Sequence, residues 1–246
     1  MMSLVEREAK CRVLQRKYYA GLPSRDWFVD QAVSSVLRSG DTMLDAGCGD
    51  TLALLNRYAT RVSFAVGVDV VKASAAPVMN AAVVVGDLSA LPLRDRSFDV
   101  VVSRSVVEHL ADPRAVFREL GRILKPDGRL IFTTPNKYYY SSLVAGVIPY
   151  SWKDAYMRGA FGDDGYDHFP VFYRANTRRD LRRVAAHAGL VLERVQALRH
   201  FPYYLLFSPT LFRLGILYDR VVTRLRLDAL QSTWLVTMRR PAEPLT

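Results

Sequence analysis

The stretch Leu44-Asp45-Ala46-Gly47-Cys48-Gly49 follows a short apolar run and decides how the rest of this sequence is interpreted. Two later apolar runs each end in an acid, at Asp69 and at Asp87. A strand that ends in Gly-x-Gly lets a ligand approach bare backbone, and the helix after it offers free N–H groups to an anion. Asp69 is then placed to bind a ribose diol, and Asp87 to meet an adenine amine. The pattern predicts a site for an adenine nucleoside with a tail at the glycine turn.

The third position of the glycine pattern distinguishes a dinucleotide from other adenine-containing cofactors. The dinucleotide fingerprint G-x-G-x-x-G would need a glycine at Leu52, and none is present. The chain instead resembles the class I S-adenosylmethionine-dependent methyltransferases, in particular the type 11 group that is similar to ubiquinone-biosynthesis enzymes. The segments that carry the resemblance are residues 45–51, 86–92, 97–110 and 124–130. The resemblance implies that the cofactor is S-adenosyl-L-methionine.

The resemblance also implies which residues bind the cofactor. They lie in the glycine turn and after the next three strands: Asp45, Gly47, Cys48, Gly49, Thr51, Asp69, Val70, Gly86, Asp87, Leu88, Ser103 and Glu108. Thr51 departs from the family pattern, which has a third glycine at this position. A β-branched residue narrows the approach to the methionine part of the cofactor, although its hydroxyl could instead bond the carboxylate.

Apolar strands alternate with helical stretches along the chain. Strands are expected at 42–46, 62–69, 82–86, 98–103, 129–134, 191–198 and 232–238, and helices at 3–20, 25–39, 114–124 and 178–188. Asn176 or Thr177 is the expected cap of the last helix. The alternation predicts an α/β, Rossmann-like sheet of seven mostly parallel strands with helices on both faces. The resemblance implies that the last strand runs antiparallel.

We interpret residues 1–246 as a single methyltransferase domain with two insertions. Its parts are N-terminal helices at 1–40, a cofactor-binding core at 41–135, an aromatic lid insertion at 136–173, and a C-terminal part at 174–246 that contains a helical insertion at 199–230. The aromatic side chains of the lid segment suit a sugar, a ring or an apolar chain. They are equally suited to form the lid's own small core.

The net charge of +10 is concentrated near the C-terminus. Residues 174–240 contain thirteen arginines and four acids, a local balance of +9. Such a segment attracts phosphate in nucleic acid, in an anionic membrane or in a substrate, unless arginine is simply a common surface residue here. The sequence shows no signal pattern and no run of eighteen apolar residues, so a cytoplasmic location is expected. Cys11 and Cys48 are not expected to form a disulfide.

The insertion at 199–230 contains an amphipathic helix for which Thr210 is the expected N-cap. Arg213, Arg220 and Arg224 line one edge of its apolar face. That face is expected to contain Leu211, Leu214, Tyr218, Val221, Val222 and Leu225. The pattern is typical of a helix that lies on an anionic membrane surface, with the protein peripheral on its inner face. It is also typical of a helix that docks on its own domain, as most amphipathic helices do.

Methyl transfer requires an acceptor in line with the methyl group and a base that takes its proton. His168, oriented by Asp167, and His109, in the Glu-His-Leu segment, are the candidate catalytic residues. Asp163 and Asp164 extend the first pair into a cluster that could hold a divalent cation. Such clusters are more often solvated turns, so no metal site is assigned.

Taken together, the sequence favours an S-adenosylmethionine-dependent O-methyltransferase. The expected acceptor is a small molecule, such as a sugar hydroxyl of a glycan or glycolipid precursor or a ring hydroxyl of a prenyl lipid, because residues 134–136 and 172–177 resemble bacterial transferases of surface polysaccharides. An RNA methyltransferase that uses the basic segment is one alternative, but no RNA-binding module is recognisable, so nucleic acid is the less favoured partner. A non-catalytic cofactor-binding or scaffold protein is another, motivated by Thr51. The oligomeric state stays open.

Overall fold

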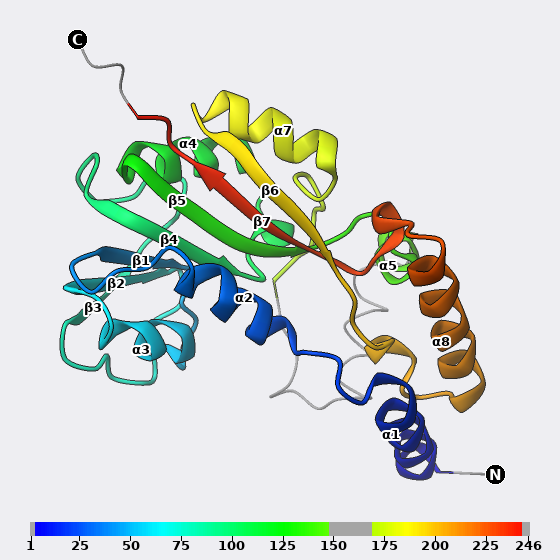
Figure 1. Ribbon diagram of the computed structural model, residues 1–246. Coiled ribbons are helices and arrows are strands. Elements are labelled where there is room, and N and C mark those ends of the chain that lie inside the picture. Colours follow the sequence, from blue (N-terminus) through cyan, green and yellow to red (C-terminus); the bar gives the residue numbers. More distant parts are fainter. Residues whose placement is uncertain (1–2, 148–168, 243–246) are drawn as a thin grey trace. The chain divides into compact units, whose positions relative to one another are not determined.

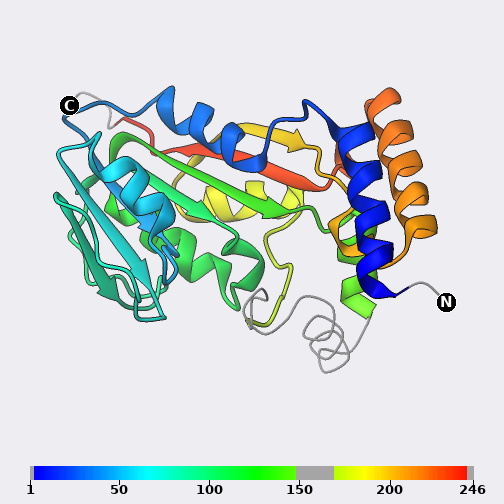
Figure 2. The same cartoon turned by 90° about the horizontal axis from the view of Figure 1, so that it is seen from below.

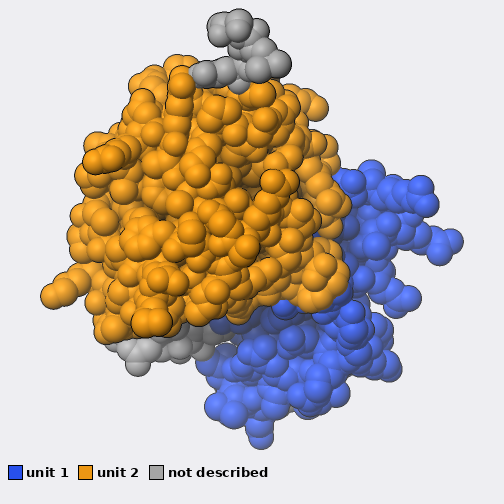
Figure 3. All heavy atoms as spheres, turned by 60° about the vertical axis from the view of Figure 1, so that its left-hand side comes forward, with its two compact units in different colours: residues 1–25, 135–170, 197–233 blue, residues 26–134, 171–196, 234–246 orange. Residues whose placement is uncertain are grey.

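The computed structural model describes residues 3–147 and 169–242, and the chain divides into two compact units (Figure 3). The helical unit comprises residues 1–25, 135–170 and 197–233, and the sheet unit comprises residues 26–134, 171–196 and 234–246. The interpretation of residues 1–246 as one methyltransferase domain stays a prediction.

The sheet unit is built on seven strands in the order β3-β2-β1-β4-β5-β7-β6 (Figure 1). Their bounds are β1 (Thr42–Ala46), β2 (Phe64–Asp69), β3 (Ala81–Val85), β4 (Phe98–Arg104), β5 (Leu124–Pro135), β6 (Val191–Leu198) and β7 (Thr233–Arg239). The strands from β3 to β5 pair in parallel, and β7 runs antiparallel. β1 and β4 are almost fully buried, as expected for strands covered on both faces. The predicted Rossmann-like fold is confirmed.

Helices cover both faces of this sheet (Figure 2). They are α2 (Arg25–Ser34), α3 (Ala53–Ala59), η1 (Val107–His109), α4 (Pro113–Ile123) and α7 (Arg178–His187). The carboxylate of Asp112 caps α4 by accepting hydrogen bonds from the first turn, and Pro113 follows at the position where its missing N–H costs nothing. Thr177, one of the two predicted caps, accepts the N–H of Asp180 at the start of α7.

Two element boundaries differ from the predictions by five residues, and the other predicted bounds differ by two residues or fewer. β5 begins at Leu124 instead of 129, because the chain stays extended before Arg129 and pairs with β4 through an irregularity between Phe98 and Val100. α2 ends at Ser34 instead of 39, where consecutive serines compete for backbone hydrogen bonds and weaken the helix. Neither difference moves the carboxyl ends of β1, β2 and β3, on which the predicted site depends.

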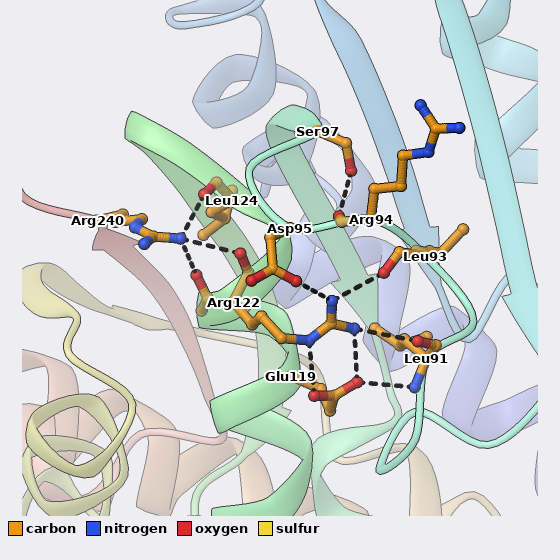
Figure 4. A network of polar contacts seen from close by, with 10 residues as sticks. Leu91, Leu93, Arg94, Asp95, Ser97, Glu119, Arg122, Leu124 and Arg240 are labelled. Carbon is orange, nitrogen blue, oxygen red and sulfur yellow. Dashed lines mark hydrogen bonds and ion pairs between the residues drawn. The ribbon is translucent and has the colours of Figure 1, made fainter.

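An arginine network fixes the loop after β3 to α4 (Figure 4). Arg122 donates to the carbonyl oxygens of Leu91 at 3.0 Å and Leu93 at 2.8 Å, and forms ion pairs with Glu119 and Asp95. Glu119 in turn accepts the N–H of Leu91 at 2.9 Å. The hydrogen bonds from Arg122 lower the pKa of Glu119, so the acid stays ionised and the loop keeps its place.

The helical unit contains α1 (Leu4–Tyr19), α5 (Tyr140–Val147), η3 (Tyr203–Leu205), α8 (Pro209–Arg224) and η4 (Asp228–Leu230). α1 and α8 lie side by side (Figures 1 and 2) and contact each other. Their shared core consists of Cys11, Tyr19, Leu206, Phe212 and Ile216. On the same side of α8, Gly215 lets the segment before η3 pack closely, since an added Cβ would lie 2.8 Å from Pro202.

The start and the faces of α8 correct two predictions. Ser208 is the N-cap and Thr210 is not, because Pro209 fits the first helical position and leaves the cap to the residue before it. α8 docks on its own unit, but through a face that contains Phe212, Gly215, Ile216, Asp219 and Val222. Of the predicted apolar face, only Val222 is buried, and Leu211, Leu214, Val221 and Leu225 are exposed. Asp219, buried on the docked face, accepts the Tyr19 hydroxyl at 2.5 Å.

Candidate cofactor-binding site

The glycine turn follows β1 in the sheet unit, at the carboxyl edge of the sheet. Gly47 has φ +83° and Gly49 has φ +66°, a left-handed conformation that costs glycine little. A Cβ on Gly47 would lie 2.1 Å from Cγ2 of Val106. The N–H of Gly47 donates to the carbonyl oxygen of Val68 at 2.8 Å. Both glycines are therefore required by backbone geometry, as the motif predicted.

Asp69 holds this turn from the end of β2. One carboxylate oxygen accepts the N–H of Gly49 at 2.8 Å, and the other accepts the N–H of Val71 at 3.0 Å. Each carboxylate oxygen has two acceptor sites, so capacity for ribose hydroxyls remains. The bond to Gly49 spans twenty residues and was not predicted. The predicted ribose contact stays a prediction.

Asp45 carries an unsatisfied acceptor in the buried part of the site. Its side chain is 1% exposed, and Oδ2 has no hydrogen-bond partner within residues 3–147 and 169–242. Burial raises the pKa of Asp45 to about 7, while the charge of Arg104 acts in the opposite direction. A buried carboxylate oxygen without a partner is costly, and a cationic donor would remove the cost. The ammonium group at the methionine end of S-adenosylmethionine is a donor of that kind, so this residue fits the cofactor.

The side chain of Cys48 packs between the glycine turn and Gly67 of β2. It is buried, and burial together with the nearby charges of Asp45 and Asp69 raises the pKa of its thiol to about 12. A neutral thiol is a poor nucleophile, so Cys48 has a packing role. Gly67 of β2 makes room for it, since an added Cβ would lie 2.9 Å from the sulfur. Cys11 and Cys48 are both buried free thiols.

The segment after β3 lies beside the end of β2. The N–H of Gly86 donates to the carbonyl oxygen of Asp69 at 2.8 Å, and Asp87 is exposed with its carboxylate on the N–H of Ser89. Leu88 is buried. The parallel register aligns Ala46 with Val68 and Asp69 with Val85, so the three strands end at the same edge of the sheet. The structure thus brings together the ends of β1, β2 and β3, as the sequence predicted.

Ser103 and Glu108 are both buried, and each is bonded within the sheet unit. The Ser103 hydroxyl donates to the carbonyl oxygen of Ala46 at 2.7 Å, which ties β4 to the start of the glycine turn. Glu108 accepts the Thr134 hydroxyl at 3.4 Å, and the Asn176 amide donates to Thr134 at 2.6 Å. Thr134 and Asn176 were not predicted as site residues, although both lie in the segments that resemble bacterial polysaccharide transferases.

The remaining predicted residues differ in their exposure, and some lie outside the described residues. Thr51 and Val70 are exposed, and His109 is half-buried in η1. His168 and Asp167 lie outside the described residues, as do Asp163 and Asp164. Within the described ranges, no three His, Cys, Asp or Glu side chains are arranged to hold a metal ion. In the same ranges, no helix is long and apolar enough to cross a membrane.

Comparison with known proteins identifies the class to which this site belongs. Residues 44–132 match the family model described as a methyltransferase domain. Residues 44–132 therefore match a class I S-adenosylmethionine-dependent methyltransferase domain, and the cofactor of this domain is S-adenosyl-L-methionine. The matched residues include the glycine turn, Asp69 and Asp87.

Two curated relatives illustrate the match. A probable S-adenosylmethionine-dependent methyltransferase of Mycolicibacterium smegmatis is 37% identical over 109 residues, which are 42% of this chain and 41% of that protein. The chain thus matches about two fifths of the length of this relative. The ubiquinone biosynthesis O-methyltransferase of Chromobacterium violaceum is 28% identical over 198 residues, which are 76% of this chain and 78% of that protein.

Solved structures agree on the fold. An S-adenosylmethionine-dependent methyltransferase from Mesorhizobium loti has a TM-score of 0.54 at 19% identity, over 86% of this chain and 98% of that one. Geranyl diphosphate C-methyltransferase from Streptomyces coelicolor, solved with S-adenosyl-L-homocysteine, has a TM-score of 0.56 at 18% identity, over 88% and 77% of the two chains. At these identities the likeness shows the fold alone.

Asp45 predicts how cofactor binding depends on pH. Only its ionised form pairs with an ammonium group, and its pKa is about 7. The affinity for S-adenosylhomocysteine should therefore rise roughly tenfold between about pH 5.5 and about pH 7, measured by calorimetry. Asp45→Asn should remove this dependence. A wild-type affinity that stays constant over the range would contradict the assignment.

The free energy of unfolding of the cofactor-free protein should fall as the pH rises, whereas the affinity for the cofactor rises. Folding raises the pKa of Asp45 above its unfolded value, so the folded state holds this proton more tightly than the unfolded chain does. The contribution of Asp45 to stability is complete below its unfolded pKa of about 4. This contribution is lost as the pH rises through about 7, the pKa of Asp45 in the folded state.

Proposed function

We propose that the protein transfers a methyl group from S-adenosylmethionine to a hydroxyl oxygen of a small molecule. The proposed acceptor is a sugar hydroxyl of a glycan or glycolipid precursor, or a ring hydroxyl of a prenyl lipid. The observation that carries the proposal is the similarity to a ubiquinone biosynthesis O-methyltransferase over three quarters of both chains. The cytoplasmic location stays a prediction.

S-adenosylmethionine, when bound, supplies an electrophilic methyl group. The chain's own residues then have two tasks, which are to orient the acceptor and to take the proton of its hydroxyl group. The glycine turn, Asp45 and Asp69 are suited to hold the cofactor at the carboxyl edge of the sheet. His168 with Asp167 is the proposed base, and His109 is the alternative.

The acceptor class can be tested with radiolabelled S-adenosylmethionine. The purified protein is incubated with extract from cells that lack the gene, and the extract is separated into lipid, glycan and RNA fractions. Label in a hydroxyl-bearing lipid or glycan, with a mass gain of one methylene group, would support the proposal. Label in RNA would favour an RNA methyltransferase, and cofactor binding without any labelled product would favour a non-catalytic protein.

The role of His168 predicts a separation between turnover and cofactor binding. His168→Ala should lower kcat on the identified acceptor by about 100-fold or more, because general-base catalysis contributes at least that much. The dissociation constant of S-adenosylhomocysteine should not change. His187→Ala, on the exposed end of α7, is the matched control and should keep full turnover. An equal loss of cofactor affinity in His168→Ala would place the residue in cofactor binding instead.

A further inference from the structure

The exposed side of α8 is unusually apolar for a helix that already has a docked face. Its large exposed residues are Leu211, Leu214, Leu217, Val221 and Leu225, with exposed fractions between 39% and 60%. At 100° per residue they fall on one side of the helix, opposite the face that packs on α1. The docked side of α8 is buried in the core of its own unit. Its second apolar side would need a further apolar partner to be removed from water. The helical unit leaves this second face, which we call the outer face of α8, uncovered among the described residues.

Arginine side chains border the outer face. Arg213, Arg220 and Arg224 are exposed and lie along one edge, between the outer and the docked sides. None of the three forms an ion pair with a carboxylate within residues 3–147 and 169–242. The one acid of α8, Asp219, is buried and bonded to Tyr19. The charge of the edge is therefore uncompensated.

The neighbouring helix adds charge of the same sign. α1 carries five basic residues against Glu6 and Glu8, and one of the acids, Glu8, is paired with Arg12. Lys10, Arg16 and Lys17 are exposed. A second copy of the chain would bring two basic helix pairs together, which is unfavourable. An anionic surface neutralises both helices, so charge complementarity favours it over a self-association interface.

We propose that the outer face of α8 docks on an anionic lipid surface. The apolar residues enter the boundary between headgroups and acyl chains, and the arginine edge contacts the lipid phosphates. The helix is short and contains Gly215, so it lies on the surface and does not span it. The proposal does not depend on which acceptor the protein methylates.

Sedimentation of the full chain with vesicles tests the proposal. The vesicles contain phosphatidylcholine with about one third phosphatidylglycerol, compared with phosphatidylcholine alone. The wild type should sediment with the anionic vesicles at low salt and be released at high salt. R213Q/R220Q/R224Q should lower the bound fraction at low salt at least about tenfold, and L214Q/L217Q should do the same without changing the charge.

A matched control separates the outer face from general charge. R179Q/R182Q/R194Q removes the same charge from exposed positions of the sheet unit, and it should sediment like the wild type. All variants should keep the wild-type unfolding temperature and affinity for S-adenosylhomocysteine. The proposal is overturned if the wild type stays in the supernatant, or if the control loses as much binding as the α8 variant. It is also overturned if light scattering shows a dimer that L214Q/L217Q dissociates.

Discussion

Asp69→Ala should lower the affinity for S-adenosylhomocysteine by at least about 100-fold, because it removes two kinds of contact at once. The carboxylate holds the N–H groups of Gly49 and Val71, and the same oxygens are predicted to accept the ribose hydroxyls. Each charge-assisted hydrogen bond contributes roughly tenfold or more to affinity. Calorimetry with the purified variant gives the dissociation constant, and circular dichroism checks that the sheet is intact.

The matched comparison is Asp87→Ala, which removes an acid from the end of the next strand. Asp87 is exposed, and its carboxylate accepts only the N–H of Ser89 among the described residues, so its loss should weaken binding much less. Asp69→Asn keeps one acceptor oxygen and should lie between the two. If Asp69→Ala binds S-adenosylhomocysteine as the wild type does, the ribose site has been assigned to the wrong residue.

The cofactor turn could be predicted from sequence because its requirements are local. A buried strand, two glycines and an acid after the next strand follow each other within thirty residues, and parallel pairing brings them to one edge. Contacts between distant positions could not be predicted this way. Asn136, for example, donates to the carbonyl oxygens of Ala229 and Gln231, more than ninety residues away. No periodic pattern encodes such a partner.

α8 shows a second limit of sequence reasoning. Periodicity predicted an amphipathic helix with an arginine edge, and both are present. It could not show which of two apolar sides docks, because Leu214 and Phe212 have similar hydrophobicity. Steric room determines which side docks, because Gly215 lies on the docked side and allows Pro202 to approach closely there. Gly215 is visible in the sequence, so its position in the helix is the signal that could have identified the docked side of α8.

Gly47→Ala should produce the largest loss of stability in the turn, because two penalties coincide at this position. At φ +83° an L-residue is strained by about 1–2 kcal/mol, and the new Cβ would lie 2.1 Å from Cγ2 of Val106. Overpacking of this kind costs roughly 1–3 kcal/mol more. Together these penalties should lower the unfolding temperature by about 4–20 °C in a chain of this length, and affinity for S-adenosylhomocysteine should fall with it.

Gly49→Ala is the control that measures the cost of backbone strain alone. Gly49 has φ +66°, but nothing lies within 4 Å of an added Cβ, so only the strain of about 1–2 kcal/mol should appear. The double variant Gly47→Ala/Val106→Ala removes the clashing methyl groups and should recover the packing part of the loss, measured as a coupling free energy in a double-mutant cycle. Equal unfolding temperatures for Gly47→Ala and Gly49→Ala would mean that Val106 gives way at little cost. The requirement for glycine at position 47 would then come from backbone conformation alone.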